Sequence, residues 1–354
     1  MLAAIGTCAA GLATGALGAG AATSSSGPPC GPHGAAAVID AIDDGIAHRI
    51  YAEELSSAEV SADVSRITNS TALASAVASG NRRRIQSVTH AIVYTPVWHI
   101  VRLRVLSPSG ALLADVGGPY ILAPVTGEIT NNGKTVGSFV MSVQDDKGYK
   151  KLVQHITGAD VELYLGGKPL LGTLAKPPSR PPSGGQLRLR GVSYNVDSYS
   201  VEAFPSGTLR VTVLVPDPPA ALGASSCAQV RLATDAGIVH NVASGLMDSG
   251  HNIYSNLNLF ISQAYGYTHV PVFIFEFGGE EAGTDALLST PPAPASLTPR
   301  SASVTYDNAR WLVSAQRPYP PQWIYVLVPV RPNALSGSSG SSGSSGTSGQ
   351  TGGQ

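Results

Sequence analysis

Polar side chains that could hold a small solute alternate along two segments that the sequence predicts as β-strands. In WHIVRLRVL, Arg102 and Arg104 share a face with Trp98, and in VGSFVMSVQ, Ser142 and Gln144 share a face, because successive strand residues point to opposite sides. The planar arginine guanidinium has donors placed to bind a ligand carboxylate, and the Trp98 indole could pack on the apolar part of the ligand or on its cationic group. The pattern predicts an anion pocket in the N-terminal half.

Four further residues at predicted strand ends or in loops complete this candidate ligand site and could bind an amine: Asp115, Asp145, Asp146 and Tyr149. The alternative is a solvated polar face on which the arginines pair with the acids. The QDD segment could attract Ca²⁺, but it lacks the alternating oxygen ligands of a calcium loop. The favoured alternative is a strand end at which an aspartate caps the predicted helix KGYKKLVQHI.

The sequence contains none of the common metal, phosphate or nucleophile motifs. Its eight histidines never form H-E-x-x-H, and C-x-x-C, G-x-S-x-G and Walker patterns are missing. His48 and His240 occupy similar places on two predicted helices and are interpreted as residues on the flanks of those helices. We therefore expect no metal, no cofactor and no catalytic residues.

Composition excludes some partners. The 354 residues carry 22 Lys+Arg and 23 Asp+Glu, a formal charge of −1, so no field of one sign recruits nucleic acid or anionic lipid. Nucleic acid is therefore not an expected partner. The 43% hydrophobic content is enough for the cores of two modules.

The two ends of the chain differ from its middle. Residues 1–22 contain no charged side chain and offer a small-x-small cleavage site after Ala21, which predicts an export signal, with an uncleaved membrane anchor as the alternative. Residues 23–35 are expected to be a linker, and residues 332–354 a disordered Ser/Gly tail. The expected product is secreted or at the cell surface, with no transmembrane helix after signal removal.

Two cysteines remain after removal of such a signal. An even pair in an oxidising compartment indicates a disulfide between Cys30 and Cys227. Two separate buried thiols are the alternative, because spacing does not give the Cα separation that a bridge requires.

One predicted strand occurs twice in the sequence in similar form. VELYLGG and FIFEFGG are each followed by a proline-rich segment, two further strands and a closing LVP. Pro216 follows Gly166 by 50 residues, and Pro329 follows Gly278 by 51. This spacing indicates a duplicated module, with a period too long for a solenoid repeat.

The elements around the repeat predict an α+β fold. A long amphipathic helix is expected from residue 36 to 67, bent near Ser56 and Ser57, followed by a shorter helix over 82–95. Hairpin turns at SPSG and TNNGK then predict a five- or six-stranded antiparallel meander in a first module at 36–217. The second module, 218–331, is reduced because it lacks counterparts of residues 96–145.

This combination resembles the double Cache family of extracellular sensor domains, in which PAS-like modules follow one another. The resemblance rests on the long leading helix, VRLRVLSPSGALLADVG, GKTVGSFVMSVQDDKGYKKL and the two closing strands, and covers roughly residues 36–330. It implies tandem PAS-like modules, each an antiparallel sheet packed on a leading helix. It also implies that the membrane-distal-type first module binds an amino acid, a carboxylate or an amine.

The family passes its signal through a following transmembrane helix, where this sequence has the Ser/Gly tail. The expected function is therefore an exported sensor-type protein without its own output domain, whose partner is a membrane signalling protein. The alternative is a structural or adhesion protein that uses the same folds as a scaffold, and an enzyme ranks third.

Overall fold

The chain is described by a computed structural model. It covers residues 28–95, 99–119, 121–248, 256–276, 279–285, 292–317 and 322–330, with the backbone alone described at 247, 248 and 279–281. The predicted export signal, the predicted tail and Trp98 lie outside the described residues.

The leading helix breaks where the sequence predicted a bend. Helix α1 spans Gly31–Ser56, beginning five residues before the expected start at 36, and α2 spans Ala58–Thr68. Ser57 between them is extended, and its Oγ accepts from Val60 N–H at 3.2 Å. A serine in this position satisfies a free donor of the new helix, which makes Ser57 the cap that separates the two.

A small subdomain follows the leading helix. Helices α3 (Thr71–Ala78) and α4 (Arg82–Val93) lie with α2 against a four-stranded sheet in the order β2-β1-β4-β3. Its strands are β1 (Arg102–Leu106), β2 (Leu112–Gly117), β3 (Val125–Asn131) and β4 (Lys134–Ser142). The β3–β4 turn places Asn132 and Gly133 at positive φ, as a two-residue hairpin turn requires.

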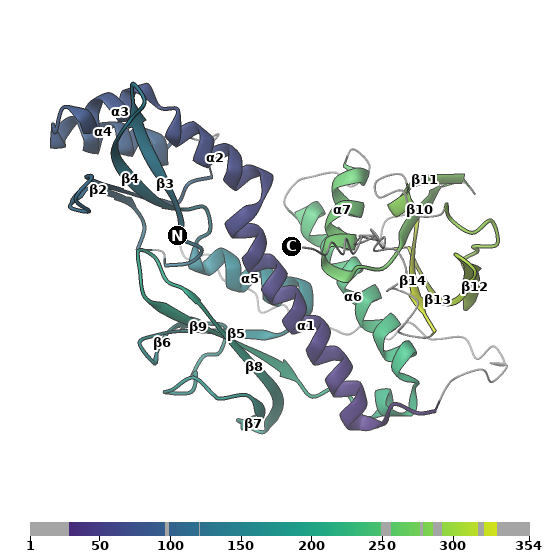
Figure 1. The fold of residues 1–354 in the computed structure, drawn as a ribbon. Coiled ribbons are helices and arrows are strands. Elements are labelled where there is room, and N and C mark those ends of the chain that lie inside the picture. Colours follow the sequence, from purple (N-terminus) through teal and green to yellow (C-terminus); the bar gives the residue numbers. More distant parts are fainter. Residues whose placement is uncertain are drawn as a thin grey trace, which may run out of the picture.

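A second sheet of five strands completes the first module. After α5 (Asp146–Thr157) come β5 (Asp160–Leu165), β6 (Lys168–Gly172), β7 (Gly185–Leu189), β8 (Val192–Glu202) and β9 (Thr208–Pro216), in the antiparallel order β6-β5-β9-β8-β7. The expected single meander is thus wrong. Helix α5 separates β4 from β5, and residues after it begin a new sheet (Figure 1).

The second module repeats this five-stranded sheet. Following the short helix η1 (Ala220–Ala224), it contains α6 (Cys227–Asp248), α7 (Leu257–Thr268), β10 (Val272–Glu276), β11 (Gly279–Gly283), β12 (Ser303–Tyr306), β13 (Ala309–Gln316) and β14 (Trp323–Pro329). The order β11-β10-β14-β13-β12 is that of the first sheet. The predicted α+β fold of two antiparallel modules is confirmed, and the described part of the second module has no counterpart of β1–β4.

Strand pairing fixes which residues of the two modules correspond. Val161 pairs with Val213 in the first sheet, and Val272 pairs with Val326 in the second. Since the closing strands match from their final prolines, Val272 is the counterpart of Val161. Matching VELYLGG to FIFEFGG letter by letter instead gives Phe273, and such a one-residue slip exchanges the two faces of a strand.

The two modules share one core. Helices α1 and α6 lie side by side between the two five-stranded sheets (Figure 1). A continuous apolar cluster runs from Val161 and Val213 through Ile46 and Val239 to Val326. None of the helices in the described ranges is long and apolar enough to span a bilayer.

A disulfide ties the beginnings of the two leading helices. Cys30 and Cys227 are bonded, with their Cα atoms 4.7 Å apart and a separation of 197 positions in sequence. The Cys30 N–H also donates to the Ser225 carbonyl at 2.8 Å. The start of α1 is therefore joined to the start of α6 by a covalent bond and a backbone hydrogen bond.

Candidate functional site

The structure brings together three of the residues that the sequence selected for ligand binding. Arg102 donates to both carboxylate oxygens of Asp115, Nε–Oδ1 and Nη2–Oδ2 each at 3.0 Å, and Arg104 Nε lies 3.9 Å from Oδ2. The Arg102 guanidinium also lies 4.5 Å from the centre of the Phe204 ring. The two arginines of β1 therefore share one acid on the neighbouring strand β2, as in the alternative interpretation in which the arginines pair with the acids.

Other selected residues hold the segment 121–123 and the start of α5. Ser142 Oγ donates to the Leu122 carbonyl at 2.7 Å, and Asp146 Oδ1 accepts from Ile121 N–H at 3.0 Å. Asp145 Oδ1 accepts from Gly148 N–H at 2.7 Å and so caps α5. Gln144 Nε2 donates to the Asp145 carbonyl at 3.2 Å. Their hydrogen bonds are thus made within the chain.

Tyr149 lies in the core of the first module. Its hydroxyl donates to the Ala47 carbonyl at 3.2 Å and lies 2.6 Å from the Tyr199 hydroxyl on β8. The pKa of Tyr149 is raised well above its ordinary value, mainly because the side chain is buried. With no exposed surface, Tyr149 joins α5 to α1 and β8.

A different set of polar side chains lies on the face of the first five-stranded sheet that points away from α1. We call it the outer-face site, and it consists of Glu162 and Tyr164 on β5, Ser198 on β8, and Arg210 and Thr212 on β9. In the ladder, Tyr164 lies opposite Arg210, and Thr212 lies between Glu162 and Ser198. The five side chains therefore form two adjacent rows across the central strands.

A proline-rich segment, residues 173–184, covers this face, and we call it the strap. Leu174 N–H donates to Glu162 Oε1 at 2.7 Å, and Tyr164 Oη donates to the Pro178 carbonyl at 3.2 Å. Arg210 Nη2 and Ser198 Oγ both reach the Pro182 carbonyl, each at the long distance of 3.4 Å. The strap is held firmly where it begins and loosely near Pro182.

Hydrogen-bonding capacity remains unused beneath the strap. Glu162 has no exposed surface, and in the part of the chain that the structure describes neither its Oε2 nor the buried Arg210 Nε has a hydrogen-bond partner. Within the described residues, Arg210 forms no ion pair with a carboxylate. Burial raises the pKa of Glu162, although the Leu174 N–H opposes this. Buried polar groups with unmade bonds cost free energy, so this face is suited to a polar occupant.

The second module shows that the fold itself does not require these polar groups. Paired in the same way, the counterparts of Glu162, Tyr164, Arg210, Thr212 and Ser198 are Phe273, Phe275, Trp323, Tyr325 and Ala315. All five counterparts belong to one apolar cluster. The same face is therefore filled by aromatic packing in one module and by polar residues under a strap in the other.

Sequence reasoning missed the outer-face site although β9 carries a signal for it. In TLRVTVLVP, Arg210 and Thr212 alternate with Leu209, Val211 and Val213, which places one arginine on a strand that is otherwise apolar. Alternation assigns the face, but the strap and the strand opposite Arg210 follow only from the pairing.

One group of side chains has donor atoms suited to a metal ion. Atoms of Asp44 and His48 on α1 and of Asp197 on β8 lie within 4.8 Å of one another. The His48 ring stacks on Tyr199 with centroids 3.5 Å apart. Burial, followed by a hydrogen bond with Asp197, raises the pKa of Asp44 to about 7. Zinc and manganese accept such mixed donors, but 47% of the His48 side chain is exposed, as in many ion-free surface clusters.

Comparison with known proteins assigns no family to the chain. No protein-family model matches the sequence, and a search of curated proteins found no match. Two crystal structures of the Vibrio cholerae LuxQ periplasmic domain, one of them with selenomethionine, align with 51% of this chain and with 98% and 96% of their own. Identity is 12% and the TM-score 0.30 in both cases. We therefore base the functional proposal on this chain's own residues.

Proposed function

We propose that the chain is a sensor-type protein that binds a small carboxylate-bearing solute at the outer-face site of its first module. The observation that carries this proposal is the state of Arg210. Its guanidinium has a buried Nε for which no described residue is a hydrogen-bond partner, and its Nη2 donates to the Pro182 carbonyl at the long distance of 3.4 Å. A bidentate carboxylate is the partner that best fits such a planar pair of donors.

The surrounding groups suggest how the rest of a solute is held. The hydroxyls of Ser198 and Thr212, 2.9 Å apart, can donate or accept. The free Glu162 oxygen can accept from an ammonium or hydroxyl group. An amino acid or a hydroxy acid therefore suits the site better than a plain hydrocarbon acid.

Binding at this site requires the strap to shift near Pro182. The solute carboxylate replaces the Pro182 carbonyl on Arg210, while the shorter Leu174–Glu162 bond keeps the start of the strap in place. The four prolines of the strap have fixed φ angles, so the strap moves as a stiff piece. Its displacement is the first structural change that the solute causes.

The disulfide supports an extracytoplasmic location for this function. Disulfides persist in oxidising compartments and are rare in the cytosol, and Cys30 and Cys227 form one here. In the proposed protein the second module, whose outer face is apolar and filled, acts as a spacer or a docking surface for a membrane signalling partner.

A thermal-shift screen of the full chain with amino acids, mono- and dicarboxylates and amines tests the proposal. We expect at least one carboxylate to stabilise the wild type by ligand linkage. Arg210→Met, which keeps the apolar stem, should abolish the shift. Arg188→Met, on the exposed edge strand β7 of the same sheet, should retain it.

Two results would contradict the assignment of the site. A shift that is lost in Arg102→Met but retained in Arg210→Met would place the solute at the four-stranded sheet. The absence of any shift across the panel would favour the structural or adhesion scaffold.

A further inference from the structure

The contact between α1 and α6 buries an acid from each helix. Asp43 is 2% exposed and Asp235 is 1% exposed. The two residues correspond, because each lies five positions before the matching histidines His48 and His240 of IAHRI and IVHNV. The duplicated helix therefore brings two buried carboxyl groups to the junction between the modules.

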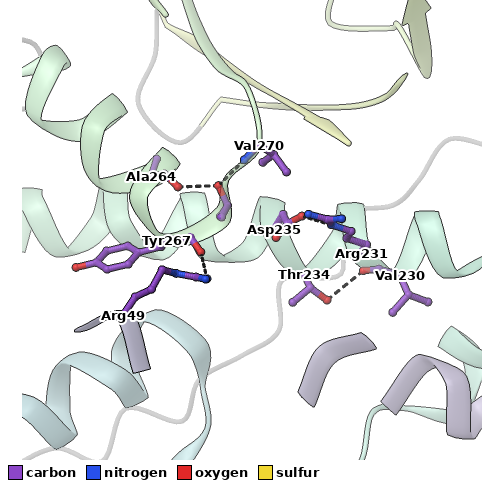
Figure 2. Close-up of polar contacts among 9 residues, drawn as sticks. Arg49, Val230, Arg231, Thr234, Asp235, Ala264, Tyr267 and Val270 are labelled. Atoms are coloured by element: carbon purple, nitrogen blue, oxygen red, sulfur yellow. Dashed lines mark hydrogen bonds and ion pairs between the residues drawn. The ribbon is translucent and has the colours of Figure 1, made fainter. Parts of the chain in front are cut away.

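The two acids differ in their partners. Asp235 forms an ion pair with Arg231 at 3.3 Å, as Figure 2 shows. Within the described residues Asp43 has no ion pair, and its Oδ1 is buried without a hydrogen-bond partner. Arg49, the cation on the same helix, donates instead to the Tyr267 carbonyl at the end of α7 (Figure 2). Asp43 is thus a deeply buried acid of the junction that no described cation pairs with.

Charged groups approach this junction from four elements. From α1 come Asp40 and Arg49, from α6 Arg231 and Asp235, from the end of α7 His269, and from β8 Asp197. The acids Asp40 and Asp235 act directly on Asp43. An ionised Asp43 would be desolvated and would repel both, a cost that the unpaired carboxyl avoids by holding its proton.

We propose that the contact between the two modules is a proton-dependent latch, closed when Asp43 is neutral and weakened when Asp43 ionises. Opening the junction exposes Asp43 to water, where it ionises readily, so opening releases a proton. The latch is therefore tightest in acid and loosens as the pH rises. A proton thus regulates the module junction, a role separate from solute binding at the outer-face site.

The raised pKa of Asp43 follows from this geometry. Burial, then Asp40 and Asp235, raises the pKa of Asp43 to about 8 in the closed state, from the ordinary 3.8. A raised carboxyl pKa means that the closed state binds more protons than the open state between these two values. Closure therefore weakens as the pH rises from about 4 to about 8 and does not weaken further above that.

Amide hydrogen exchange of the full chain at pH 5, 6, 7 and 8, corrected for the intrinsic rate, tests the latch. In the wild type we expect protection of the α1 and α6 amides to fall by up to about tenfold per pH unit. Protection in the edge strands β7 and β12, away from the junction, should stay constant. Asp43→Asn should flatten the profile most between pH 7 and 8, because the raised pKa values of the neighbouring acids Asp44 and Asp235 are lower, at about 7 and about 6. Asp63→Asn, which alters a fully buried acid paired with Arg66 on α2, should keep the wild-type profile.

Asp235→Asn provides a second variant in case Asp43→Asn does not fold. Without the Asp235 carboxylate, the pKa of Asp43 in the closed state is raised less. The loss of amide protection in α1 and α6 should therefore be complete at a lower pH. The latch is overturned if Asp43→Asn keeps the wild-type dependence, if Asp235→Asn leaves the midpoint unchanged, or if the edge strands lose protection together with α1 and α6.

Discussion

Arg102 and Arg210 are both arginines on sheet strands, yet they differ in what lies near them. Arg102 lies opposite Gly117 in the β1–β2 ladder, and its side chain makes two 3.0 Å bonds with Asp115, which is two residues away on β2 and faces Arg104. Arg210 faces Tyr164 and Ser200, neither of which is an acid. Pairing completes the first guanidinium and leaves the second available, which is why the proposed ligand contact is Arg210.

Arg102→Met should lower stability modestly without affecting solute binding. The side chains of Arg102 and Asp115 are 17% and 28% exposed, so solvent screens the pair and the loss in free energy of unfolding should be about 1 kcal/mol. Arg104→Met should cost less, because Arg104 lies 3.9 Å from the same acid. Urea denaturation of both variants checks this order, and an equal loss would contradict it.

How far the sequence predicts each side chain depends on whether its partner is local. The cap at Asp145 was foreseen as an alternative because its partner, Gly148, is three residues away. The sequence predicted that the arginines could pair with acids but did not identify the Arg102–Asp115 pair, because alternation shows which face a side chain is on and not which residue of the next strand lies near it. The outer-face site was missed because its covering segment comes from outside the strands.

At the scale of elements, the sequence predicted the kind of structure better than the grouping of strands. The repeat correctly indicated two related sheets, and the helix bend at Ser57 was expected. The division of the first module into two sheets was not, because hydrophobic alternation looks the same in either grouping. The one-residue error in matching VELYLGG to FIFEFGG has the same origin. Aligning the two segments by residue type pairs residues that lie on opposite faces of their strands.

Gly172→Ala should loosen the strap. A Cβ at Gly172 would overlap the Glu162 carboxylate, pushing it away from Leu174 N–H. We expect a loss of about 1–3 kcal/mol in stability and faster hydrogen exchange at the Leu174 amide. Gly237→Ala is the control, because its added methyl meets nothing within 4 Å. An unchanged Leu174 exchange rate would refute this anchoring role for Glu162.

At the scale of the whole molecule, the two modules are joined rather than strung together. The expectation of a sheet on its own leading helix is met on both sides, but α1 and α6 also pack on each other and merge the cores. Sequence periodicity did not reveal this, because apolar residues spread around a helix indicate burial on more than one side without showing which element covers each side.

Removing the disulfide should weaken this joined structure. Cys30→Ala with Cys227→Ala frees the starts of α1 and α6 and lets the unfolded chain expand over 197 residues. We expect a loss of about 2–5 kcal/mol, measured by thermal or urea unfolding, and a similar loss for the wild type under a strong reductant. Equal stability of the oxidised, reduced and substituted forms would contradict it.

The most direct test of the central claim is a crystal structure of the full chain with the carboxylate that gives the largest thermal shift. The account predicts that the carboxylate lies on Arg210 beneath the strap, with the Pro182 carbonyl displaced from the guanidinium. A solute bound instead at Arg102 and Arg104, or on the second module, with the strap unmoved over Arg210, would contradict it.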